Sequence, residues 1–194
     1  MMTAKRLLIS AIVLSLLQIG FLGWIITSRA GLLRAGTEVL LRIQPVDPRD
    51  LLRGDYVSLR YDIDRIPAAI ITNIPPGAST TEAGPLFVRL KKGTDGFWEA
   101  ASASFGAPPA TPPGPGDADI RGDVAAGWSL DQAAFVDPDY GIDRFYLPEG
   151  EGRAIENDMR ERPFAMRVAI GRDGTAQIKA LMDGDKTLFE EPLY

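Results

Sequence analysis

The chain of 194 residues contains no cysteine and no histidine. The missing cysteine excludes disulfide bonds and thiolate zinc sites, and the missing histidine excludes imidazole metal ligands. Any reaction that needs a catalytic cysteine or histidine is excluded as well. These absences remove a large share of enzyme mechanisms, but they fit a protein on either side of a membrane.

Acidic residues are absent from the first 37 positions and begin at Glu38. Taking Lys5 and Arg6 from the 21 basic residues leaves 19 against 26 acidic residues, a net charge of −7 for the rest of the chain. A net-acidic domain repels phosphate backbones, so we expect no nucleic-acid partner.

Leu7 to Ile26 forms an uncharged apolar run, which is long enough as a helix to cross a hydrocarbon core of about 30 Å. Trp24 lies where an interfacial anchor belongs. We therefore predict one transmembrane helix that contacts the lipid bilayer through Leu7 to Ile26. We assign residues 1–30 to a cytoplasmic stub and anchor, and 31–194 to one β-rich domain.

The orientation follows from charge and length. Lys5 and Arg6 precede the span, which narrowly favours a cytoplasmic N-terminus, and long domains translocate largely regardless of their charge. We predict a single-pass protein of the cytoplasmic membrane with a periplasmic or extracellular domain. The alternative is a signal peptide cleaved after Ala30, but the apolar run exceeds the usual 7 to 15 residues of such peptides.

The most locally determined stretch is Pro45 to Ile63. Asp47 is placed to cap a helical turn, Pro48 fits its first position and Asp50 its third, and Gly54 fits the left-handed exit. An alternation of apolar and polar residues from Asp55 to Ile63 then predicts a strand with Leu59 and Tyr61 on its buried face.

The same stretch carries a family resemblance. Gly54, Asp55, Tyr56, Leu59 and Tyr61 spell GDYxxLxY, so the chain resembles the GDYXXLXY family of bacterial membrane-anchored proteins. The resemblance implies one N-terminal membrane segment and an extracytoplasmic domain of uncharacterised function. It also implies a polytopic membrane protein as partner.

The remaining patterns are mostly those of strands, at 37–43, 86–91, 97–104, 120–128, 140–147, 164–170, 176–182 and 186–189. Asp-Gly turns predict two hairpins, one at KGTDG and one at GRDGT. Ala107 to Asp119 is rich in proline and glycine and predicts a surface loop, while Arg153 to Arg162 predicts one short helix. The expected fold is mainly β, a sandwich or partly open barrel, with one short helix and the anchor.

Aromatic and arginine residues on the predicted polar faces are candidate binding groups, because these residue types often anchor interfaces. The predicted contact surface consists of Asp55, Tyr56, Arg60, Tyr140, Asp143, Arg144 and Glu149. We predict a binding or accessory protein with no cofactor, no metal and no catalytic residue.

Two groups of carboxylates suggest an alternative function for the protein. Asp47, Asp50 and Asp55 beside two arginines suit either a capped turn or a site for a metal or polar ligand. Asp137, Asp139 and Asp143 suggest calcium, but Ile142 and Pro148 occupy the glycine and glutamate positions of an EF-hand loop. The alternative function is therefore a metal-dependent hydrolase that uses Asp and Glu residues.

Overall fold

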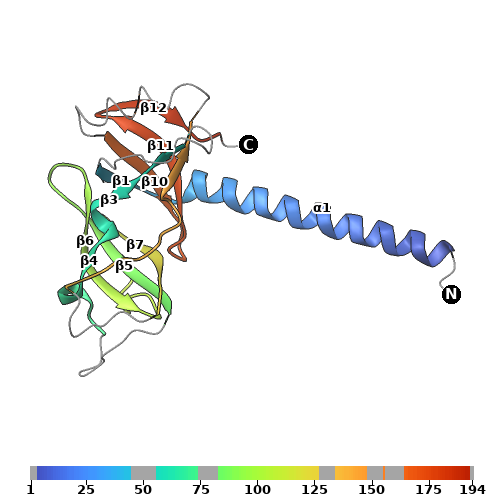
Figure 1. Cartoon of the computed structure of the whole chain (residues 1–194), viewed down its shortest axis with the longest axis horizontal. Helices are drawn as coiled ribbons and strands as arrows, with labels where there is room; N and C mark the ends of the chain where they lie inside the picture. Colours follow the sequence, from blue (N-terminus) through green and yellow to red (C-terminus); the bar gives the residue numbers. More distant parts are fainter. Residues whose placement is uncertain are drawn as a thin grey trace.

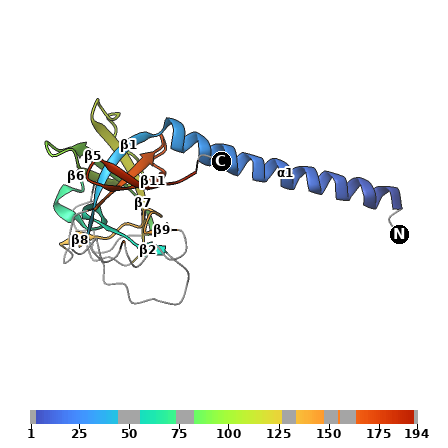
Figure 2. The ribbon, with the colours of Figure 1, turned by 90° about the horizontal axis from the view of Figure 1, so that it is seen from above.

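One long helix and a β-rich domain make up the computed structural model, which describes residues 4–44, 56–73, 83–126, 134–147, 155 and 164–192. Helix α1 runs over Ala4–Ala35 and projects from the domain as a single rod (Figures 1 and 2). None of its most apolar 18-residue stretch is buried inside the protein, so it is no core helix. Its length and hydropathy suffice to cross a membrane.

The last turns of α1 are packed into the domain. Ala30 and Leu33 are buried, and the helix lies against strands of the C-terminal part of the chain. At Gly36 a Cβ would approach the Leu32 carbonyl oxygen to 2.7 Å, so only glycine fits between the helix end and the sheet. The helix and the domain are joined by packing as well as by the chain.

The main sheet brings the two ends of the domain sequence together (Figure 1). Its order is β12-β11-β10-β1-β3, with antiparallel pairing throughout. The strands are β1 (Thr37–Gln44), β3 (Arg60–Tyr61), β10 (Phe164–Ile170), β11 (Ala176–Asp183) and β12 (Lys186–Glu190). β1 pairs with β3, so the first two predicted strands lie side by side.

A second sheet has the order β6-β5-β7 and contains the first predicted hairpin. Its strands are β5 (Gly84–Lys92), β6 (Trp98–Phe105) and β7 (Asp117–Val124). A buried ion pair joins β5 to β7, in which both Asp119 oxygens accept from Arg89 at 2.7 Å. Arg89 also donates to the Thr111 carbonyl at 2.6 Å, so the proline-rich loop before β7 is tied to the sheet.

Two short ribbons complete the described strands. They pair β2 (Tyr56–Ser58) with β9 (Arg144–Tyr146), and β4 (Ile66–Pro67) with β8 (Phe135–Val136). Two 3₁₀ turns lie near them, η1 (Asp62–Asp64) and η2 (Ala68–Ile70). Apolar residues from both sheets and both ribbons form one large hydrophobic cluster, and Ala165, Ala180 and Met182 of the main sheet form a small second one.

The mainly β fold with an N-terminal apolar helix is confirmed, with two local corrections. The strand predicted over Asp55 to Ile63 is split, because β2 and β3 pair with different strands and η1 follows Tyr61. The strand predicted over Tyr140 to Leu147 is limited to β9, since Gly141 turns the chain with φ +69°. The helix predicted over Arg153 to Arg162 lies outside the described residues except for Ile155, which is helical and buried.

Candidate functional site

Two tyrosines cross-link the end of the motif strand to the segment around Gly141. The Tyr61 hydroxyl donates to the Ile142 carbonyl at 2.9 Å, and the Tyr140 hydroxyl donates to the Ile63 carbonyl at 2.9 Å. Both rings are buried. Because each tyrosine bonds the segment that carries the other, the two bonds form a reciprocal clamp, which we call the tyrosine clamp.

The backbone beside the tyrosine clamp extends the same connection. The Leu59 amide donates to the Asp143 carbonyl at 2.8 Å, and Tyr56 to Ser58 pair with Arg144 to Tyr146 in an antiparallel ribbon. Leu59 is buried in the main core. The leucine and the second tyrosine of GDYxxLxY thus hold the segment 140–146 against the sheet.

A polar cleft of about 500 Å³ opens beside the clamp, and we call it the clamp cleft. Its charged lining residues are Arg60, Asp62, Asp64, Arg65, Asp137, Asp139 and Asp143. Several of these are paired. Asp62 accepts from Gln44 at 2.8 Å and lies 3.5 Å from Arg42, and Arg65 lies 3.9 Å from Asp137. The excess of carboxylates gives the cleft a negative charge.

Asp64 is the most perturbed carboxyl in the clamp cleft. Burial raises its pKa from the ordinary 3.8 to about 6, and the nearby Asp137 and Asp143 add to the rise. The Tyr61 amide, which donates to Asp64 at 2.9 Å, and Arg60 act in the opposite direction. Asp64 therefore takes up a proton in a weakly acidic medium.

Burial also determines the protonation state of the two clamp hydroxyls. It raises the pKa of Tyr61 and of Tyr140 well above 10, and the negative charge of Asp64 strengthens the effect at both. Both phenols stay protonated at neutral pH and act as hydrogen-bond donors. Their observed partners are backbone carbonyls, so these groups hold the structure together.

A family model also matches this chain. The model described as GDYXXLXY protein matches residues 18–181, most of the chain. The chain belongs to the GDYXXLXY family. Neither the comparison with curated proteins nor that with solved structures found a match.

The match gives the GDYXXLXY family motif a physical interpretation. In this member, Leu59 supplies core packing and Tyr61 supplies one half of the tyrosine clamp. The remaining residues predicted to shape the turn lie outside the described residues, namely Asp47, Pro48, Asp50 and Gly54. Their capping role stays a prediction.

The predicted contact surface is only partly described. Arg60 and Asp143 are exposed and line the clamp cleft, and Arg144 is exposed in β9. Tyr140 is buried with its hydroxyl bonded, which gives it a structural contact. Asp55 and Glu149 lie outside the described residues, and of Tyr56 only the backbone pairing is described.

Two groups of carboxylates are the candidates for metal binding. Across the described ranges, no group of three acidic side chains is arranged to hold a metal ion. Asp139 uses one oxygen to accept from the Gly141 amide at 2.8 Å, which is ordinary turn chemistry. The group at Asp47, Asp50 and Asp55 lies outside the described residues, so the hydrolase alternative stays a prediction.

Sequence reasoning missed Asp64 and Ile142 as parts of the site. Asp64 follows the expected strand and reads as an ordinary polar residue until η1 folds it back onto the Tyr61 amide. Asp64 lies three residues after Tyr61, which is the spacing of a carboxylate that caps a helical turn. This spacing is the feature of the sequence that could have identified Asp64. Ile142 takes part through its carbonyl, which leaves no trace in the sequence.

Proposed function

We propose that this protein is a single-pass, membrane-anchored accessory protein whose extracytoplasmic domain binds an integral membrane protein beside it. The observation that supports this is the packed joint between α1 and the sheet, in which Ala30 and Leu33 are buried. An anchor joined in this way holds the domain at a fixed height above the membrane. The domain can then contact only partners at the same membrane surface.

The packed joint also favours a retained anchor over a cleaved signal peptide. Ser28, Arg29 and Ala30 lie inside the continuous helix α1, and Ala30 is 7% exposed. Cleavage after Ala30 would separate the buried Ala30 from the sheet. The domain therefore gains stability from keeping its leader.

The clamp cleft is the proposed contact site for the partner. It lies beside the tyrosine clamp, which fixes the surrounding backbone, and its exposed charges can recognise a polar segment. Arg60 projects from β3 and is exposed, and it forms no side-chain hydrogen bond or ion pair among the described residues. An exposed arginine on a rigid strand is well suited to act as an anchor.

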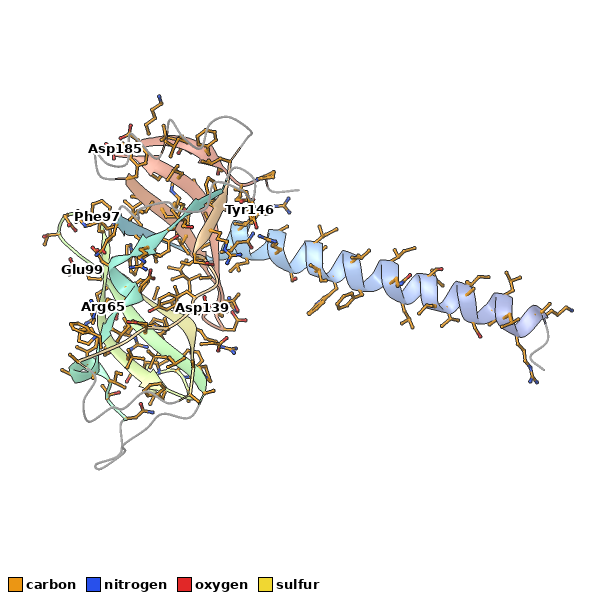
Figure 3. All side chains as sticks on the ribbon, viewed as in Figure 1. Arg65, Phe97, Glu99, Asp139, Tyr146 and Asp185 are labelled. Atoms are coloured by element: carbon orange, nitrogen blue, oxygen red, sulfur yellow. The ribbon has the colours of Figure 1, made fainter. Side chains whose placement is uncertain are left out.

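The test is a position-specific photo-crosslink in native membranes. A crosslinker in place of Arg60 is expected to give an adduct with an integral membrane protein, whereas one in place of Asp185, in the distant β11–β12 turn (Figure 3), is expected to give none. Arg60→Ala should also abolish co-purification of that protein and leave unfolding unchanged. Equal adducts from both positions would reject the clamp cleft as the contact site.

A further inference from the structure

A second hollow lies where helix α1 meets the domain, and we call it the joint groove. Its volume is about 840 Å³. One wall is the stretch of α1 from Trp24 to Leu32, and the others are residues 141–146 and 171–178 with Glu191. Tyr146, which is 68% exposed, lies near the point where the helix leaves the domain (Figure 3).

The position of the joint groove along α1 places it at the depth of lipid headgroups. If Leu7 to Ile26 crosses the hydrocarbon core, the headgroup layer on each side is about 5 to 7 Å thick. At about 1.5 Å per residue, Arg29 lies about 4.5 Å and Leu32 about 9 Å beyond Ile26. The groove therefore opens at the membrane surface, with Trp24 at its lower rim.

The lining of the joint groove complements an amphipathic zwitterion, a molecule that has an apolar part and charges of both signs. Its apolar area is contributed by residues such as Trp24, Ile25 and Ile178, next to charged residues of both signs. Arg29 on the helix and Glu191 after β12 have no ion pair or side-chain hydrogen bond among the described contacts. One unpaired cation and one unpaired anion in the same groove match a phosphate and an ammonium group.

A buried polar group gives independent support. Gln177 lines the groove and is only 7% exposed, yet its side-chain nitrogen has no hydrogen-bond partner. An unpaired buried amide costs about 1 to 3 kcal/mol, so native proteins usually satisfy such groups. A ligand oxygen that reaches this nitrogen from the groove would supply the missing acceptor.

We propose that the joint groove binds the headgroup of one zwitterionic phospholipid of the surrounding bilayer, of the phosphoethanolamine type. Arg29 pairs with the phosphate, Glu191 pairs with the ammonium group, and Gln177 donates to a phosphate or ester oxygen. The acyl chains run down past Trp24 along the helix. This lipid site rests on the anchoring part of the proposed function and is independent of any protein partner.

The experiment measures lipid retained by the full-length protein. Delipidated protein in detergent is titrated with phosphatidylethanolamine or phosphatidylglycerol of identical acyl chains, and bound lipid is counted by native mass spectrometry. The wild type is expected to bind one phosphatidylethanolamine about tenfold more tightly than phosphatidylglycerol.

The variants assign the contacts. Arg29→Gln should weaken binding of both lipids about tenfold, whereas Glu191→Gln should weaken only phosphatidylethanolamine and remove the preference. Gln177→Leu should weaken both lipids a few-fold and leave the fold intact, because it removes an unpaired group. Arg29→Lys, which keeps the charge, should retain binding. Arg6→Gln at the opposite end of α1 is the matched control and should change nothing.

Two results would overturn the headgroup site. One is equal retention by the wild type, Arg29→Gln and Glu191→Gln, which would indicate lipid contact around the helix only. The other is a preference for phosphatidylglycerol. Failure of anchoring itself would be recognised separately, because the wild type would then be released from membranes by carbonate extraction.

Discussion

The clamp cleft and the joint groove share part of one wall, Ile142 and Asp143, but they differ in how their polar groups are satisfied. In the clamp cleft, the buried hydroxyls of Tyr61 and Tyr140 are bonded to backbone carbonyls. In the joint groove, the buried amide nitrogen of Gln177 has no partner. The buried hydroxyls beside the first hollow are satisfied within the protein, whereas the buried amide nitrogen at the second is not.

This difference separates two uses of polar residues in one small domain. Bonded polar groups near the family motif fix the backbone, and the energetic cost of burying them is offset within the protein. The unbonded Gln177 amide beside helix α1 has no such compensation within the protein, so a bound molecule could provide it. Tyr61, Tyr140 and Gln177 are all buried, so burial does not distinguish them. The difference lies in whether the buried polar group has a hydrogen-bond partner.

The largest effect is expected where the joint groove is built. Leu33 is 1% exposed in the last turns of α1, and Leu33→Ala removes buried apolar volume. We expect a loss of about 2 to 5 kcal/mol in the free energy of unfolding of the detergent-solubilised protein, measured with denaturant.

The matched control is Leu22→Ala, the same change at a helix position that is 57% exposed and faces no other part of the domain. It should leave the unfolding free energy of the domain unchanged. Equal stability of the two variants would mean that the helix is only loosely attached and that the joint groove has no fixed wall.

The next-largest effect is expected when the tyrosine clamp is broken. Tyr61→Phe or Tyr140→Phe removes one hydroxyl and leaves one buried carbonyl without this donor. Each change should cost about 1 to 3 kcal/mol in urea unfolding. Because both bonds join the same two segments, the double variant should cost less than the sum of the two single changes. Strict additivity would show that the two bonds act independently.

A smaller effect depends on pH and concerns Asp64. Its pKa is raised from 3.8 to about 6, so the folded protein binds this proton more tightly than the unfolded chain does. Stability from this group is therefore lost as the pH rises from about 4 to about 6. Since Asp64 is only half-buried, solvent screening reduces the effect to about 1 kcal/mol.

Asp64→Asn should remove that pH dependence and still accept from the Tyr61 amide through its side-chain oxygen. Unfolding curves at pH 4.5 and pH 7 measure it, with Asp185→Asn in the distant β11–β12 turn as the control that keeps the wild-type pH dependence. A wild-type protein that is equally stable at both pH values would contradict the assignment to Asp64.

The sequence predicted the features that local patterns decide. The long apolar helix, the paired strands β1 and β3 and both Asp-Gly hairpins follow from periodicity and turn residues, and Gly96 and Gly174 have the positive φ that such turns need. The predicted alternation also placed Leu59 and Tyr61 on the buried face, where the structure has them.

The features that distant partners decide were not predictable. The break in the motif strand depends on β9, which lies about ninety positions further along the chain and pairs with β2. Tyr140 looks like an exposed binding residue in the sequence, and only its bond to Ile63 shows its structural role. The joint groove combines three separated segments, so no local pattern could indicate it.

The smallest effect concerns Gly141, the residue before the wall that the two hollows share. Gly141 has φ +69°, a left-handed conformation that costs other residues about 1 kcal/mol, so Gly141→Ala should destabilise the protein by about that amount. Gly84→Ala is the matched control, because its Cβ would meet nothing within 4 Å and its φ is not left-handed. That control should be neutral or slightly stabilising, since alanine restricts the unfolded chain. If Gly141→Ala disturbs lipid retention and the Arg60 crosslink together, the shared wall couples the two hollows; if it affects stability alone, they are independent sites on one rigid support.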